Sequence, residues 1–146
     1  MSSILSRIVG VAVLAALALA AEGAAAAPLD KRIIEFGWDV PDTASVRAHI
    51  RDMEKLPFDG CVLRMYGTHD GEKVDGYTVF RKEAWTRGWF EQCAADLRAT
   101  EFRTLTDNFL LMWTTPGTPD WFSDDDWRAV CNNIGILAWV AKEGTT

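Results

Sequence analysis

The sequence predicts an α/β fold in which parallel strands alternate with helices, as in the first three strand–helix units of a TIM-type (β/α)8 barrel. Two observations lead to this prediction. Short apolar runs, typical of strands covered on both faces, alternate with stretches whose apolar residues recur every three to four positions. Polar and aromatic loops follow the apolar runs, as at the face of a barrel that carries active sites. A small three-layer α/β domain is the alternative.

The first strand is expected within Arg32–Asp42, an apolar run that leads into an aromatic loop. Side chains of a strand alternate between its faces, so Glu35 and Gly37 share one face and Phe36 and Trp38 share the other. A carboxylate in so apolar a strand indicates either a functional group or a buried ion pair.

Residues 1–26 have the pattern of an export signal, which leaves 27–146 as the barrel portion. Arg7 supplies the positive charge, Ile8–Ala21 is apolar, and small residues precede a cleavage site expected after Ala26. We therefore expect a secreted or periplasmic protein with no stable membrane span after cleavage. The alternative is anchoring by an uncleaved segment, although 14 apolar residues fall short of the roughly 20 that span a bilayer.

The next elements complete a strand–helix–strand unit. Asp42 or Thr43 can cap a helix that ends near Leu56, before Pro57. Its apolar stripe is Val46, Ile50 and Met53. A second strand is expected over Cys61–Tyr66. The polar stretch 67–85 carries Asp-Gly turn signals and predicts a hairpin with a strand over 77–80.

The last part of the chain predicts two helices around a third strand. The first helix is expected over Trp89–Ala99 and the strand over Phe102–Asp107. Residues 108–113 are expected to continue either as strand or as an apolar loop. Ser123 can cap the final helix, which closes at Gly144. Its predicted stripe is Trp127, Val130, Cys131, Ile134, Leu137, Ala138 and Ala141.

Charge and cysteine content exclude several classes of function. The net charge is −6 and no cluster of basic residues occurs, which disfavours nucleic acid and anionic membranes as partners. Cys61, Cys93 and Cys131 have no metal or redox spacing, so we expect three buried thiols and no metal. One disulfide with a free thiol is the alternative in an exported protein. No glycine-rich nucleotide loop follows the first strand, and no cofactor is predicted.

Four segments carry a family resemblance: Lys31–Asp39, Met53–Gly60, Thr106–Leu110 and Thr115–Gly117. With them, residues 27–146 resemble a group of uncharacterised secreted bacterial proteins whose barrels are similar to those of glycoside hydrolases. The resemblance implies a secreted carbohydrate-active hydrolase with carbohydrate as its partner. Proteins of that group are longer, so this chain is expected to be a truncated part of such a barrel.

Candidate site residues follow from the predicted strand ends, because side chains at the carboxyl ends of barrel strands line the active site. Glycoside hydrolysis uses two carboxyl groups, and Glu35 and Asp107 are the candidate catalytic pair. The candidate substrate-binding residues are Trp38, Asp39, Arg64, Tyr66 and Asn108. In the structural interpretation, Glu35 and Arg64 instead form a buried ion pair, and Asp107-Asn108 caps a loop.

A second function class also fits the sequence. A non-catalytic secreted module could bind a saccharide or a surface partner through exposed tryptophans, namely Trp85, Trp89, Trp113 and Trp121. An incomplete barrel would also leave a strand edge unpaired, which allows self-association.

Overall fold

The computed structural model describes residues 31–114 and 117–144, and the described residues from Arg32 onward form one compact unit. The predicted export signal, residues 1–26, lies outside the described residues. No helix in the described ranges is both long enough and apolar enough to cross a membrane.

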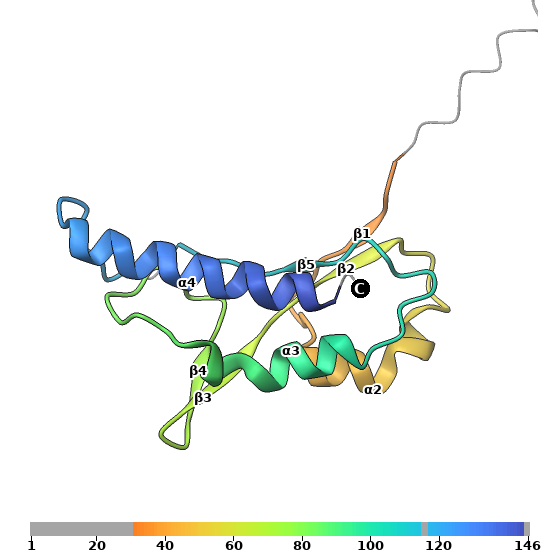
Figure 1. Cartoon of the computed structure of the whole chain (residues 1–146). Helices are drawn as coiled ribbons and strands as arrows, with labels where there is room; N and C mark the ends of the chain where they lie inside the picture. Colours follow the sequence, from red (N-terminus) through yellow and green to blue (C-terminus); the bar gives the residue numbers. More distant parts are fainter. Residues whose placement is uncertain (1–30, 115–116, 145–146) are drawn as a thin grey trace, which may run out of the picture. The chain divides into compact units, whose positions relative to one another are not determined.

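The fold is mixed α/β, with a small parallel sheet of three strands (Figure 1). β1 (Ile34–Glu35) pairs with β2 (Gly60–Leu63), and β2 pairs with β5 (Phe109–Leu110). The spatial order β1-β2-β5 follows the order along the chain, as in successive staves of a barrel. Over the described residues the sheet is open, and no closed barrel is formed.

An antiparallel hairpin follows β2 directly. It consists of β3 (Tyr66–His69) and β4 (Glu72–Asp75), which turn at Asp70-Gly71. Asp70 and Gly71 both have positive φ, the conformation that Asp-Gly hairpin turns require. The hairpin expected within 67–85 is therefore present, but its second strand is 72–75 and the expected strand at 77–80 is not formed.

α2 (Thr43–Met53) and α4 (Asp124–Glu143) begin where the sequence predicts, whereas the helix predicted over Trp89–Ala99 begins at Glu91. α2 is capped by Asp42, whose carboxylate accepts a bond from the Ser45 amide at 2.7 Å. α4 is capped by Ser123, whose hydroxyl accepts from the Asp126 amide at 3.3 Å. Between them, the short 3-10 helix η1 (Arg87–Phe90) leads into α3 (Glu91–Arg98).

The helices pack on one face of the sheet. Cys61 and Leu63 of β2 point into a single core with apolar residues of all three α-helices: Val46, Ile50, Cys93, Ala94, Leu97, Ile136 and Val140. In Figure 1, α2 and α3 lie together, and α4 runs beside α3 and β5. The three-layer alternative needs helices on both faces, and the described helices do not provide this.

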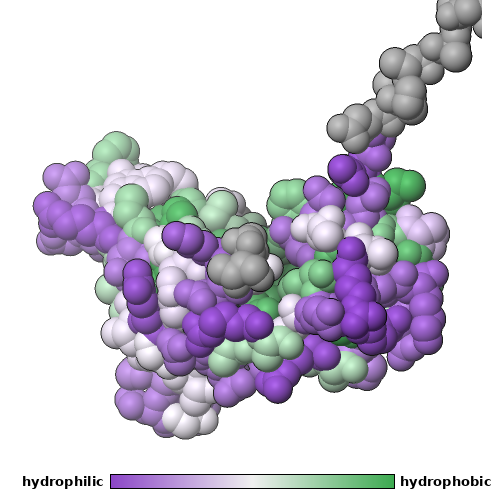
Figure 2. Space-filling model, turned by 45° about the vertical axis from the view of Figure 1, so that its right-hand side comes forward, coloured by the Kyte–Doolittle hydropathy of each residue, from purple (hydrophilic) through white to green (hydrophobic). Residues whose placement is uncertain are grey.

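No described helix covers the opposite face of the sheet. Val62 and Phe109 are paired across β2 and β5 and point away from the core, and Phe109 is 56% exposed. Phe36, which follows β1, is 63% exposed. Figure 2 shows hydrophobic residues in a hollow between more polar parts of the surface. Parallel sheets are normally buried on both faces, so this apolar exposure is the unusual feature of the fold.

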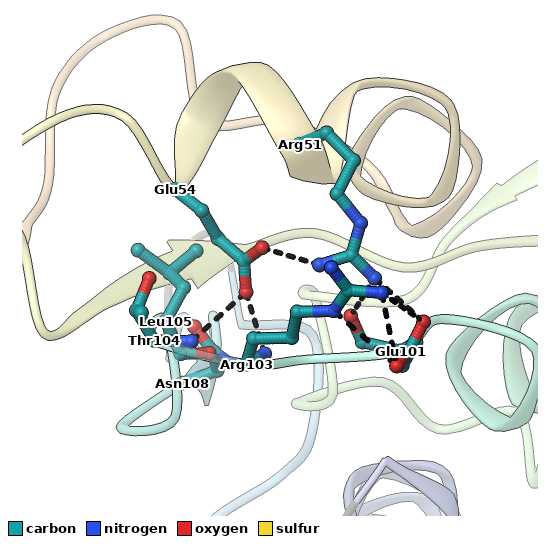
Figure 3. Close-up of polar contacts among 7 residues, drawn as sticks. All are labelled: Arg51, Glu54, Glu101, Arg103, Thr104, Leu105 and Asn108. Atoms are coloured by element: carbon teal, nitrogen blue, oxygen red, sulfur yellow. Dashed lines mark hydrogen bonds and ion pairs between the residues drawn. The ribbon is translucent and has the colours of Figure 1, made fainter.

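The third strand is displaced from its predicted position. The prediction of a strand over Phe102–Asp107 was wrong, because this segment is a loop held by side-chain hydrogen bonds. β5 begins at Phe109, within the stretch 108–113 that was expected to be strand or apolar loop. Glu54, at the end of α2, accepts the amide bonds of Arg103 (2.5 Å) and Thr104 (3.0 Å) and pairs with Arg51 (Figure 3). Backbone groups satisfied in this way are not available for a strand ladder.

α4 is rotated relative to the predicted stripe. Its buried residues are Ala129, Val130, Asn133, Ile136 and Val140, while Cys131 and Ala138 are exposed. Residues one position apart on a helix point about 100° apart, so burial of Val130 turns Cys131 outward. The prediction of three buried thiols therefore holds for Cys61 and Cys93 and is wrong for Cys131.

Candidate functional site

A cleft opens at the carboxyl ends of the parallel strands, with a volume of about 360 Å³. Its lining comes from segments that follow β1, β2 and β5: Phe36, Gly37, Trp38, Val40, Arg64 and Trp113. The polypeptide is joined across this end by hydrogen bonds from the Arg64 amide to the Pro41 carbonyl and from the Leu111 amide to the Leu63 carbonyl, both 2.8 Å. Three separate loops are therefore brought to one site by the parallel register.

Arg64 is the polar centre of the cleft. Its Nη1 donates to the Tyr66 hydroxyl at 3.3 Å, and its Nη2 donates to the Trp38 carbonyl at 3.0 Å. The guanidinium carbon lies 5.7 Å from the centre of the Tyr77 ring. The hydrogen bond to Tyr66 raises the pKa of Arg64, and the nearby charge of Asp39 acts in the same direction. A guanidinium that is fixed in position and permanently charged is suited to donate hydrogen bonds to oxygen atoms of a ligand.

Aromatic rings surround this cation. Tyr77 packs edge-on against Trp113 (centroids 5.2 Å apart) and against Tyr66 (6.3 Å). The Trp113 amide also donates to the Tyr77 carbonyl at 2.7 Å, which fixes the loop after β5 against the loop after β4. Trp38 is 97% exposed and Trp113 is 45% exposed, so both indoles offer faces to a ligand.

The β3–β4 hairpin supports the same cluster. The Lys73 ammonium lies 3.3 Å from the centre of the Tyr66 ring. Burial and the charge of Asp75 raise the pKa of Tyr77, so its hydroxyl stays protonated and can donate. Tyr77 is not among the candidates that the sequence predicts, because the pattern of residues 77–80 favours a strand of the hairpin. The signal that could have identified Tyr77 is the Asp75-Gly76 turn directly before it, because β4 ends at Asp75.

Glu35 lies beside the cleft. It is the last residue of β1 and is half-buried, and its Oε1 is 3.2 Å from the position that a Cβ on Gly37 would occupy. Its register partner is Cys61, not Arg64. Burial, together with the charge of Glu35, raises the pKa of Cys61 to about 11. The described side-chain contacts of Arg64 are with Tyr66, Trp38 and Tyr77. The buried Glu35–Arg64 ion pair of the structural interpretation is therefore not formed.

Asp107 and Asn108 lie at the opposite, amino ends of the strands. The Asp107 carboxylate faces Arg32 at 4.0 Å, and its backbone approaches Gly60, the first residue of β2. Asn108 accepts from the Cys61 amide at 3.0 Å and donates to the Leu105 carbonyl at 2.7 Å. Both residues precede β5, so the expected pairing of Asp107 with Glu35 across one mouth is corrected: strand order and register do not bring them together.

The four tryptophans of the binding-module prediction are dispersed. Trp113 lines the cleft, whereas Trp85 is only 3% exposed and belongs to the core. Trp89 is half-buried and stacks on His69 with centroids 4.0 Å apart. Trp121 is exposed next to the amino end of α4, where it packs on Trp127. Only Trp113 of this set therefore shares a site with the strand-end candidates.

Fold and site together define a mixed α/β domain with an aromatic, arginine-centred cleft at the carboxyl ends of its parallel strands. In the parts of the chain that the structure describes, no group of three His, Cys, Asp or Glu side chains is placed to hold a metal ion. Comparison with protein-family models, curated proteins and solved structures finds no match. The resemblance to secreted bacterial barrel proteins therefore stays a prediction.

Proposed function

We propose that this protein binds carbohydrate in the cleft at the carboxyl ends of β1, β2 and β5. The observation that carries the proposal is that Trp38 and Trp113 line the same cleft as Arg64, whose guanidinium is held by the Trp38 carbonyl. Indole faces pack against the apolar faces of sugar rings, and a guanidinium donates to ring and hydroxyl oxygens. A mostly apolar cleft with a few placed polar groups is the usual form of a small-ligand site.

A glycan panel tests this proposal. Residues 27–146 are titrated against immobilised oligosaccharides, and Trp113→Ala is compared with the matched control Trp121→Ala, an exposed indole outside the cleft. We expect Trp113→Ala to weaken binding at least tenfold, because a ring stacked on a sugar is removed, and Trp121→Ala to leave it unchanged. Equal losses in the two variants, or no binding to any glycan, would exclude the cleft as the saccharide site.

Hydrolysis of the bound saccharide is the second candidate function. Its support is the position of Glu35, whose carboxylate lies beside Gly37 at the edge of the cleft. Since Asp107 is remote, the second carboxyl group within the same segment is Asp39, whose charge acts on Arg64. Glu35→Gln and Asp39→Asn should each abolish turnover on a glycoside panel while leaving saccharide binding. Turnover by both variants would leave binding as the function.

The barrel architecture belongs to the same proposal. Three parallel strands in sequential order, helices on one face and an uncovered apolar face are the features of a barrel wall, whose inner face is filled by side chains from further strands. The proposed location is outside the cytoplasm, in keeping with the export-signal pattern of residues 1–26.

A further inference from the structure

A continuous row of apolar side chains crosses the face of the parallel sheet that lies opposite the helices. Val62 and Phe109 are paired across β2 and β5 and point to this face. The β1–β2 register, which pairs Glu35 with Cys61, places Phe36 next in the same row. The row continues toward the carboxyl ends of the strands into the lining of the cleft. We call this surface the open sheet face and define it by Phe36, Trp38, Val62, Phe109 and Trp113.

The aromatic rings of the open sheet face expose a large apolar area. Its four aromatic residues, Phe36, Trp38, Phe109 and Trp113, are each between 45% and 97% exposed. Since a whole aromatic side chain presents about 150–250 Å², together they expose roughly 500 Å². The largest apolar patch of a soluble monomer is about 300–600 Å², and patches of that size mark interaction sites.

This area matches what a stable homodimer needs. Homodimer interfaces are about 65% apolar, so roughly 500 Å² of apolar surface implies about 800 Å² in total on each partner. Interfaces of standard size bury about 800 Å² on each side. A second copy of the chain also presents the identical patch, as a twofold interface requires.

Charge does not oppose this contact. Arg64 is the charged side chain that the described strands contribute to this face, and it donates within its own protomer to the Tyr66 hydroxyl and the Trp38 carbonyl. It lies at the carboxyl end of β2, so two sheets packed with their strands antiparallel keep the two guanidinium groups at opposite ends of the interface. Part of the negative charge of the chain is held far from the row, in the first turn of α4 at 124–126.

From the register, the area and the charge of the open sheet face, we propose that it is an interface with a second copy of this chain, in which two sheets pack face to face about a twofold axis. Each copy supplies the second covering layer that a parallel sheet requires. Trp38 and Trp113 belong also to the cleft, so a second copy covers the cleft and competes with a glycan. This competition, unlike the association itself, rests on the proposed carbohydrate function.

Sedimentation velocity of residues 27–146, which contain the whole compact unit, tests the proposal. Interfaces of standard size bind with micromolar or tighter affinity, so we expect a dimer at about 100 μM and its dissociation on dilution. A protein that stays monomeric at this concentration leaves the face to a different partner and overturns the proposal. Open-ended growth into larger species overturns it too, because a twofold interface closes at two copies.

Two phenylalanine variants assign the association to this face. Phe109→Asp places a carboxylate in the row on both copies and should raise the dissociation constant at least tenfold. The matched control is Phe122→Asp, which changes a 98% exposed phenylalanine before α4 and should leave the dimer intact. Equal weakening by both variants, or an unchanged dimer in a folded Phe109→Asp, rejects the interface. If circular dichroism shows that Phe109→Asp does not fold, Phe36→Asp, in the loop after β1, makes the same comparison.

Glycan binding separates this proposal from the proposed function. The apparent affinity for a glycan of the panel should fall as the protein concentration rises and recover in Phe109→Asp, whose substitution lies outside the cleft lining. Glycan affinity that stays constant while the dimer forms would place the dimer contact on another surface and overturn the proposal. Absence of glycan binding removes the carbohydrate function, and sedimentation of the two phenylalanine variants then decides the interface alone.

Discussion

Asn133 connects α4 to the segment that leads into η1, and its removal should destabilise the fold more than any other single polar change on α4. The side chain is fully buried. It accepts from the Trp85 amide at 2.8 Å and donates to the carbonyls of Val79 (3.2 Å) and Glu83 (3.0 Å). At about 1 kcal/mol net for each bond, Asn133→Ala should cost about 3 kcal/mol. For a domain of this size the corresponding fall in Tm is about 10–15 °C.

Urea unfolding followed by tryptophan fluorescence measures this cost. The matched control is Asn132→Ala, the exposed neighbour, whose amide donates to the Trp85 carbonyl at 2.9 Å and should cost about 1 kcal/mol. Asn133→Asp adds a second comparison, because it places an acidic group beside two carbonyl oxygens and should destabilise more at pH 7 than at pH 4. Equal costs for Asn132→Ala and Asn133→Ala would refute the reasoning from burial.

Three further predictions concern the amino ends of the strands and the thiols. Gly60→Ala should cost about 3 kcal/mol or prevent folding, because the new Cβ would lie 1.8 Å from the Asp107 carbonyl oxygen; circular dichroism with thermal melting measures it. Burial raises the pKa of Glu54, but bonds from the amides of Thr104 and Arg103 outweigh this and hold it below 4.5. Its stabilisation is therefore present above pH 4.5 and lost as the pH falls further, so Glu54→Gln should destabilise at pH 7 and much less at pH 3 in urea titrations. A thiol reagent at pH 8 should label the native protein at exposed Cys131 alone; rapid native labelling of Cys61, whose pKa is about 11, would contradict the buried position of β2.

The helix starts could be predicted from the sequence because their signals are local. Asp42 and Ser123 cap α2 and α4 through bonds to amides three residues ahead, and these require no tertiary information. The position of β5, in contrast, could be predicted only with tertiary information. Phe102–Asp107 has a strand-like composition, but Glu54, some 50 positions earlier, binds its amides and keeps it a loop.

That displacement decided which site predictions agree with the structure. Trp38 and Arg64 line the cleft, with Asp39 and Tyr66 acting on Arg64, because β1 and β2 were located to within a few residues. Asp107 was assigned to the wrong end of the sheet, since a shift of the strand by a few residues turns a residue that follows it into one that precedes it.

The burial of Asn133 could not be predicted from periodicity. Asn133 interrupts the apolar pattern of α4 and was left out of the stripe, although it is fully buried. A polar residue can be buried only when its partners are present, and here the partners are backbone groups of Val79, Glu83 and Trp85. Such contacts depend on the path of an irregular loop, for which the sequence carries no periodic signal.

The most direct test of the carbohydrate cleft is the response of its indoles to a bound glycan. The ¹H–¹⁵N spectrum of the protein is recorded with the oligosaccharide that binds most tightly in the panel, and the Trp38, Trp113 and Trp121 signals are assigned by single substitution to phenylalanine. We predict that the Trp38 and Trp113 signals move together with one affinity while that of Trp121 stays in place. Movement of Trp121 without Trp38 and Trp113 would contradict a saccharide site centred on Arg64.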